Sequence, residues 1–393
     1  MKATTKAKIL LFLRLFGESL FFPYISLFLK EKGFTEAQIG IFIALIPLTA
    51  LACTPLYAKI FNTPKKVKYA LSVMGMIETS LVIALLFFNE NFAVVVTLIV
   101  LISMTSSSNY GLLDSFLGLI CSESGKEFGT VRIFGAIAYL AGSSCCVIAG
   151  FVFDAVNYEV IFPIAAGLYI AVSVIFLFVK APVPAEETPA EKVTLKSVLG
   201  DKRFMGYVLF YVLFIGSMQV CDDFYSLYLV SKGNPDYYYS FVMLGFVSVE
   251  IITMFLMNRF AKPELKYLFI AGGVLAARMI IQCIPPLPTW ALIASQVSRG
   301  ITWGITLFVS TPYIIKILGF ERSTTGIVLC WFFLAVFTSI FKLCGGYIIS
   351  AIGYPYFYMI FAALTVLDLI YLVFYRRAAE KIPDLDENNI SRA

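Results

Sequence analysis

The chain has 393 residues, of which 60% are hydrophobic and only 14% charged, and its mean hydropathy is +0.87. Soluble globular domains are about 45–50% apolar and about 25% charged, so the composition excludes a soluble enzyme of one or two domains. The net charge of +5 comes from basic residues dispersed along the chain, and we expect no nucleic-acid partner.

Histidine is absent, which removes the usual general base and the commonest metal ligand. The eight cysteines lie in apolar segments without the spacing of a metal or redox motif. We therefore expect no metal site and no cofactor.

Twelve segments are apolar and long enough to cross a membrane, which takes about 20 residues. The sequence predicts an all-α integral membrane protein whose transmembrane helices cover 8–30, 36–59, 67–88, 92–121, 128–154, 158–180, 204–230, 237–259, 265–284, 289–316, 323–350 and 354–375.

The basic residues follow a strict pattern along these spans. Of the 30, 22 lie in the terminal segments and in every second loop, and five lie within the spans. Only Lys30, Lys32 and Lys232 lie in the opposite loops. The positive-inside rule then predicts a multi-pass protein of the inner (plasma) membrane with both termini in the cytoplasm.

One long connector divides the chain into halves. Residues 181–203 contain Pro182, Pro184 and Pro189 with mixed charges, as in a solvated cytoplasmic linker. This predicts an N-terminal six-helix bundle over 1–180, a C-terminal one over 204–377, and a cytoplasmic tail over 378–393.

Two local similarities support a repeat with this period. Residues 24–33 resemble 224–233, and residues 149–158 resemble 345–354, and each pair joins a span to the sixth one after it. We expect two pseudo-symmetric bundles with the substrate site between them.

Ionisable residues interrupt the apolar spans. Each costs about 2.5–3.5 kcal/mol near the bilayer centre, so such residues face one another or a polar pathway. The set holds seven carboxylates and five cations: Glu18, Glu78, Asp114, Asp222, Asp223, Glu250, Asp368, Arg14, Arg132, Arg278, Arg299 and Lys342. The excess of carboxylates favours one or two proton carriers, and sodium coupling stays open.

Depth along the helices suggests partners. Arg14 and Glu18 share a face at i,i+4 spacing. Asp222 and Lys342 both lie about 27–28 Å from the cytoplasmic end, at about 1.5 Å per residue, and we expect a structural ion pair between them. A role in transport is the alternative for this pair.

The fourth and fifth spans carry a family motif. Asp114 lies eighteen residues before Arg132. Arg132 belongs to the run Glu127-Phe-Gly-Thr-Val-Arg132-Ile-Phe-Gly. This resembles the lactose permease branch, the oligosaccharide:proton symporters, of the major facilitator superfamily. The resemblance implies that Asp114 and Arg132 bind sugar hydroxyls and that Tyr139 stacks on the sugar ring. An interhelical lock between the fourth and fifth spans is the alternative for Asp114 and Arg132. We place Glu18 in the same substrate-binding set.

The C-terminal half is similar to the phenylpropionate-permease-like and nucleoside-symporter-like branch, through residues 248–251, 277–279 and 299–304. That resemblance implies proton coupling by Glu250 and Arg278, together with Arg299. The chain departs from the lactose permease pattern, because Arg299 replaces the family's histidine and Thr302 its proton-carrying acid. The loop between the second and third spans lacks the superfamily's signature, with Lys59 where an acid is expected.

These observations together predict a secondary transporter and no enzyme. We expect proton-coupled symport of a small hydroxylated solute, a sugar or oligosaccharide, by a monomer in the bilayer with the proton gradient as energy source. Symport of nucleosides or of aromatic or organic acids, and drug efflux by antiport, are the alternatives on the same fold. A sensor on a transporter scaffold and an intramembrane enzyme find less support, since neither a metal constellation nor a nucleophile constellation is visible.

Overall fold

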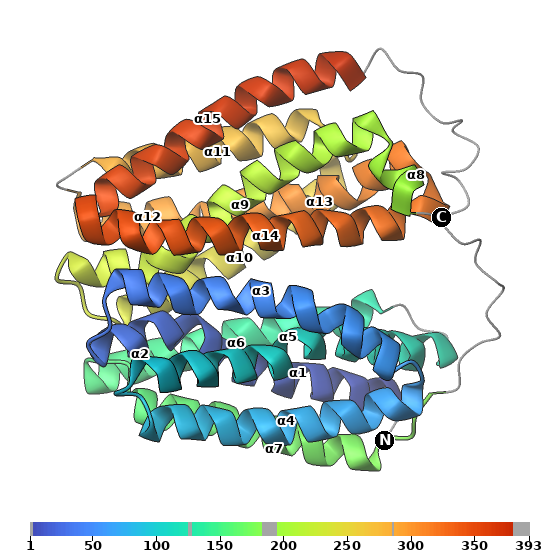
Figure 1. The fold of residues 1–393 in the computed structure, drawn as a ribbon, viewed down its shortest axis with the longest axis vertical. Coiled ribbons are helices and arrows are strands. Elements are labelled where there is room, and N and C mark those ends of the chain that lie inside the picture. Colours follow the sequence, from blue (N-terminus) through green and yellow to red (C-terminus); the bar gives the residue numbers. More distant parts are fainter. Residues whose placement is uncertain (1–2, 125–127, 183–194, 285–286, 380–393) are drawn as a thin grey trace. The chain divides into compact units, whose positions relative to one another are not determined.

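The computed structural model describes residues 3–124, 128–182, 195–284 and 287–379. Throughout these residues the regular elements are helices (Figure 1). They are α1 (Ala3–Phe21), η1 (Phe22–Tyr24), α2 (Ile25–Glu31), α3 (Glu36–Ile60), α4 (Pro64–Phe87), α5 (Phe92–Glu123), α6 (Gly129–Phe153), α7 (Tyr158–Phe178), α8 (Leu195–Leu199), α9 (Lys202–Ser231), α10 (Tyr238–Phe260), α11 (Lys266–Cys283), α12 (Thr289–Val297), α13 (Arg299–Leu318), α14 (Phe320–Ile352) and α15 (Tyr354–Ala379).

Twelve helical stretches in the described residues are long and apolar enough to cross a membrane, which confirms the predicted all-α membrane fold. Two of them are composite. The first runs over Thr4–Glu31, and its α-helix gives way to the short 3-10 turn η1 at Pro23, which has no N–H for an α-helical bond. The tenth, Thr289–Leu318, joins α12 to α13 at Ser298.

Local sequence signals explain where the helices begin. Thr35 and Gln38 form a reciprocal capping box at the start of α3. Thr63 caps α4, whose first residue is Pro64, and Asn91 caps α5. These short loops fix the ends of neighbouring helices in the first part of the chain.

The described residues form two compact units, the first within Met1–Glu187 and Ser226–Leu244, the second within Thr188–Tyr225 and Gly245–Ala393. The boundary differs from the expected one, because the end of α9 and the start of α10 belong with the first unit. Side-chain contacts explain the difference. The hydroxyls of Tyr24 and Ser240 share a hydrogen bond of 2.7 Å, and Tyr158 donates one of 2.8 Å to Asp236.

Within the first unit, α1 is the central helix and packs against α5, α6 and α7, while α4 packs against α5 and α7. Close approach depends on small residues. A Cβ at Gly17 of α1 would lie 2.8 Å from the Tyr169 ring of α7, so a larger side chain would push the two helices apart. An apolar core that includes Leu11, Leu15 and Phe116 surrounds these contacts.

Within the second unit, α11 packs against α13 and α15, and α14 packs against α13 and α15 (Figure 1). The backbone of α13 lies against α10 at Gly300, where a Cβ would come within 2.6 Å of the Glu250 amide nitrogen. Gly300 thereby brings the polar side chains of α10 and α13 close together.

The expected linker is only partly described. Residues 183–194 lie outside the described part of the chain, as do Glu127 and residues 380–393 of the expected tail. From Leu195 the connector is helical rather than solvated coil, because α8 packs against α14.

Candidate functional site

A buried ionic cluster lies inside the first unit. Arg14 donates from Nε to Glu18 Oε1 at 2.7 Å, and from Nη1 and Nη2 to the two carboxylate oxygens of Glu78 at 2.7 and 3.0 Å. Asn109 Nδ2 donates to Glu78 Oε2 at 3.3 Å. All four residues are at most 4% exposed. We call Arg14, Glu18, Glu78 and Asn109 the Arg14 cluster.

Three helices assemble this cluster around the aromatic ring of a fourth. Arg14 and Glu18 share one face of α1, Glu78 comes from α4 and Asn109 from α5. The guanidinium carbon of Arg14 lies 4.4 Å from the centroid of the Tyr169 ring on α7, a cation–π contact. The structure therefore places Glu18 in a buried ion-pair cluster rather than on a surface open to solute.

A second pair in the first unit is accessible. Arg132 Nη1 donates to both carboxylate oxygens of Asp114, at 3.0 and 3.1 Å. The Arg132 side chain is 50% exposed and that of Asp114 36%. The predicted partners thus come together, and their polar atoms stay open to another ligand. Tyr139 lies two helical turns beyond Arg132 on α6 and is partly buried against the apolar core.

The second unit holds its own ionic group around Asp222 of α9. Asp222 Oδ1 accepts from Arg278 Nη1 at 2.9 Å and from Gln296 Nε2 at 2.8 Å, and Oδ2 accepts from Arg299 Nε. We call Asp222, Arg278, Gln296 and Arg299 the Asp222 cluster. It collects side chains from α9, α11, α12 and α13.

Charge in this cluster is balanced by a neighbour. Two guanidiniums face one carboxylate, and Glu250 of α10 lies close enough to Arg299 for an electrostatic interaction. Arg299 also lies 4.2 Å above the ring centroid of Phe246. Arg278 is almost completely buried, and its Nε and Nη2 groups have no hydrogen-bond partner among the described residues. The three residues expected to couple protons therefore lie in one region of the second unit.

The expected ion pair between Asp222 and Lys342 is wrong by one residue. Lys342 Nζ lies 2.6 Å from Asp223 Oδ2. Consecutive residues on an α-helix point about 100° apart, so Asp222 faces α11 and α13 while Asp223 faces α14. Depth along the helix predicted the right level of the membrane but not the right side of the helix.

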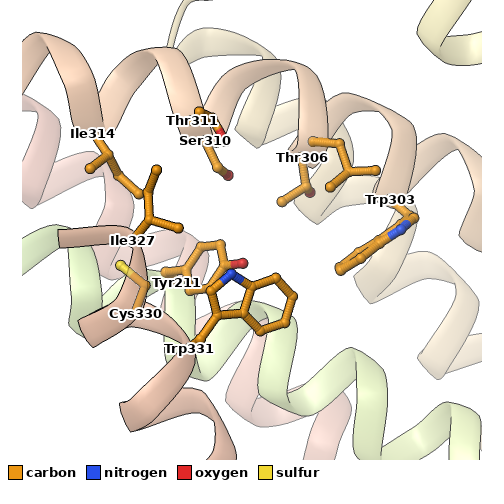
Figure 2. Close-up of a pocket in the computed structure, with 10 residues that line it drawn as sticks. Tyr211, Trp303, Thr306, Ser310, Thr311, Ile314, Ile327, Cys330 and Trp331 are labelled. Carbon is orange, nitrogen blue, oxygen red and sulfur yellow. The ribbon is translucent and has the colours of Figure 1, made fainter. Parts of the chain in front are cut away.

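A small pocket with about 50 Å³ of free space opens in the second unit between α9, α13 and α14 (Figure 2). Tyr211 and Trp331 lie on one side of it, and Thr306 and Ser310 lie across from them (Figure 2). Trp303 closes one end, so two of the three tryptophans of the chain line this space. The volume is well below that of a typical small-molecule site, and the lining combines aromatic faces with hydroxyl groups.

Sequence reasoning missed this pocket and three polar partners, Glu78, Asn109 and Gln296. Glu78 was recognisable as an intramembrane charge, but its partner was not. Asn109 and Gln296 carry no charge and give little signal in a hydropathy profile. The two tryptophans lie 28 residues apart, so only the packing of α13 on α14 brings them together.

Twelve apolar helices that bury ionic clusters in two units define a multi-pass membrane transporter. The sequence profile described as the MFS_1 like family matches residues 4–365, and the chain belongs to this family. The predicted membership of the major facilitator superfamily is therefore confirmed.

Two curated relatives match along almost their whole length. The maltose permease of Geobacillus stearothermophilus is 22% identical over 382 residues, which cover 92% of each chain. The uncharacterized transporter YwbF of Bacillus subtilis (strain 168) is 21% identical over 387 residues, 93% of this chain and 91% of that one.

Solved structures show the same fold at lower identity. The nucleoside transporter NupG has a TM-score of 0.78 and 16% identity, over 95% of this chain and 99% of that one. The POT family transporter PepTSo has a TM-score of 0.71 and 11% identity, over 97% and 99%.

Proposed function

We propose that the protein is a proton-coupled symporter of a small hydroxylated solute, a sugar or oligosaccharide. The observation that carries this proposal is the half-exposed Asp114–Arg132 pair. A carboxylate accepts hydrogen bonds from neighbouring hydroxyls, and a planar guanidinium donates to them, so the pair suits a polyhydroxylated ligand. The similarity to a maltose permease over 92% of both chains supports the same substrate class.

The pocket between α9, α13 and α14 suits the same ligand. A pyranose ring has an apolar face that packs on tryptophan and tyrosine, while the hydroxyls of Thr306 and Ser310 favour a polar edge. The pocket is smaller than a sugar ring in this conformation, and we propose that it widens to hold one ring of the solute.

For coupling we propose Glu250 with Arg278 and Arg299. Asp222 binds both arginines, and Glu250 interacts with Arg299, so protonation of Glu250 would change the charge balance around Arg299. Transport would proceed by alternating access of two six-helix halves, in a monomer without cofactor. The distribution of basic residues supports the plasma membrane as location, with both termini in the cytoplasm.

Purified protein tests the proposal. Maltose should raise the melting temperature, because a ligand that binds only the folded state stabilises it. Labelled maltose should accumulate in proteoliposomes with an imposed proton gradient and should stop accumulating with a protonophore. Asp114→Asn and Arg132→Gln should abolish both effects. Glu264→Gln is the matched control, because it removes an exposed ion pair, with Lys266, outside these sites.

A second candidate solute is a nucleoside or an aromatic acid. The two unpartnered N–H groups of buried Arg278 would suit an anionic or carbonyl-bearing ligand. Stabilisation by uridine or by phenylpropionate, with none by sugars, would favour this alternative.

A further inference from the structure

The Arg14 cluster carries one negative charge too many. Arg14 supplies one positive charge, whereas Glu18 and Glu78 supply two negative charges when both are ionised. All three side chains are buried, and an uncompensated charge in such a place costs several kcal/mol. The Asp222 cluster has the opposite arrangement, with two guanidiniums for one carboxylate. In the Arg14 cluster, by contrast, two carboxylates share one guanidinium.

The cluster also contains an acceptor without a donor. Asn109 Oδ1 is buried and has no hydrogen-bond partner among the described residues, although the other end of the same amide contacts Glu78 Oε2. An ionised carboxylate accepts only, but a protonated one donates an O–H. A half-turn of the Asn109 amide exchanges Nδ2 for Oδ1 in almost the same volume. The amide therefore fits both protonation states of Glu78.

The described residues around the cluster include a few titratable or charged groups. The titratable or charged groups are Arg14 and Glu18 from α1, Glu78 from α4 and Tyr169 from α7, with Tyr139 of α6 near enough to Tyr169 to interact with it. Tyr169 Oη is buried and has no hydrogen-bond partner in the described residues. These residues include no group of three carboxylates or thiols suited to a divalent metal ion. A single proton matches both the missing charge and the missing donor.

We infer that the Arg14 cluster binds one proton, shared between Glu18 and Glu78 and sensed by Asn109, and that this proton is transported with the solute. It adds to a carboxylate oxygen from water, and no other covalent bond changes. In the protonated form the cluster is neutral, with Arg14 paired to one remaining carboxylate. This site is additional to Glu250, and its role in transport rests on the proposed function as a symporter.

Glutamine variants test the transport role. Glu18→Gln and Glu78→Gln each replace one carboxylate by an uncharged amide and so hold the cluster in its neutral form. Both variants should fold and should exchange labelled maltose in counterflow. Neither should concentrate maltose in a proton gradient. Glu264→Gln is the control, since it removes an exposed ion pair with Lys266 and lies outside the cluster. It should concentrate maltose as the wild type does. Concentrative uptake by both glutamine variants, or uptake driven by sodium instead of protons, overturns the inference.

Infrared spectroscopy tests proton binding without any solute. In protein containing isotope-labelled glutamate, a pH step should change the C=O band of a protonated glutamate. Because Glu250 is itself proposed to take up a proton, the comparison is made in Glu250→Gln protein, in which Glu18→Gln or Glu78→Gln should remove the change that persists. If neither maltose nor any other sugar is transported, the proposed function is wrong. The infrared result then still shows whether the cluster binds a proton. A wild-type spectrum without a protonated glutamate band overturns the inference even if one glutamine variant does not fold.

Discussion

Arg14 holds Glu78 by two parallel hydrogen bonds, from Nη1 to Oε2 at 2.7 Å and from Nη2 to Oε1 at 3.0 Å. The two residues come from different helices, and the same guanidinium also binds Glu18 through Nε. Only arginine offers donors in this forked geometry. The contact therefore ties α1 to α4 and makes the charge balance of the Arg14 cluster depend on one side chain.

Removal of Arg14 should destabilise the protein strongly. Arg14→Gln leaves two buried carboxylates without a cation, and loss of one partner of a buried pair costs about 3–5 kcal/mol. Arg14→Lys keeps the charge but not the fork, so we expect an intermediate loss. Unfolding in mild detergent measures the effect, and the triple variant that adds Glu18→Gln and Glu78→Gln to Arg14→Gln should recover part of it. A melting temperature of Arg14→Gln equal to that of the wild type would contradict this account.

Adjacent acids on α9 should differ in their contribution to stability. Asp222→Asn leaves the buried guanidinium of Arg278 beside that of Arg299, and we expect a loss of about 3–5 kcal/mol. Asp223→Asn leaves buried Lys342 without its carboxylate partner, but the Asp223 side chain is 38% exposed, so we expect a smaller loss than for Asp222→Asn. Comparison of the two variants by denaturant unfolding checks the order. Equal losses would mean that the assignment of partners is wrong.

These two acids also show what the sequence can and cannot predict. The number and approximate bounds of the spans follow from hydropathy, because a bilayer requires long apolar helices whatever their packing. Asp114 and Arg132 were found through a motif that reflects the packing of two neighbouring helices. The partner of Lys342 was not found, because it depends on how α9 is rotated about its axis.

Uncharged polar partners and pockets are even harder to predict from the sequence than ion pairs. Asn109 and Gln296 change the hydropathy of a span very little, yet each completes an ionic cluster. The pocket formed by Trp303 and Trp331 exists only where α13 meets α14. Such features depend on helix packing that a single sequence does not display.

The two tryptophans that line the pocket should contribute to ligand binding, whereas the third should not. An aromatic contact contributes about 0.5–1.5 kcal/mol, so Trp331→Ala or Trp303→Ala should weaken maltose binding by up to about tenfold. Trp290→Ala is the matched control, because Trp290 is 73% exposed on α12 and does not line the pocket. Titration calorimetry measures the affinities. If all three alanine variants bind equally well, the pocket does not hold the solute.

Exchanging the charges of Asp114 and Arg132 distinguishes two roles for this pair. The pair either binds the solute or only holds α5 and α6 together. Because the pair is half exposed, Asp114→Ala and Arg132→Ala should each change stability by less than about 1 kcal/mol while abolishing maltose uptake. The double variant Asp114→Arg with Arg132→Asp restores an ion pair between α5 and α6. A pair that only locks the helices would regain transport in this variant. A pair that binds solute would not, since acceptor and donor would then face the wrong hydroxyls, and we expect uptake to stay absent although the melting temperature returns to that of the wild type.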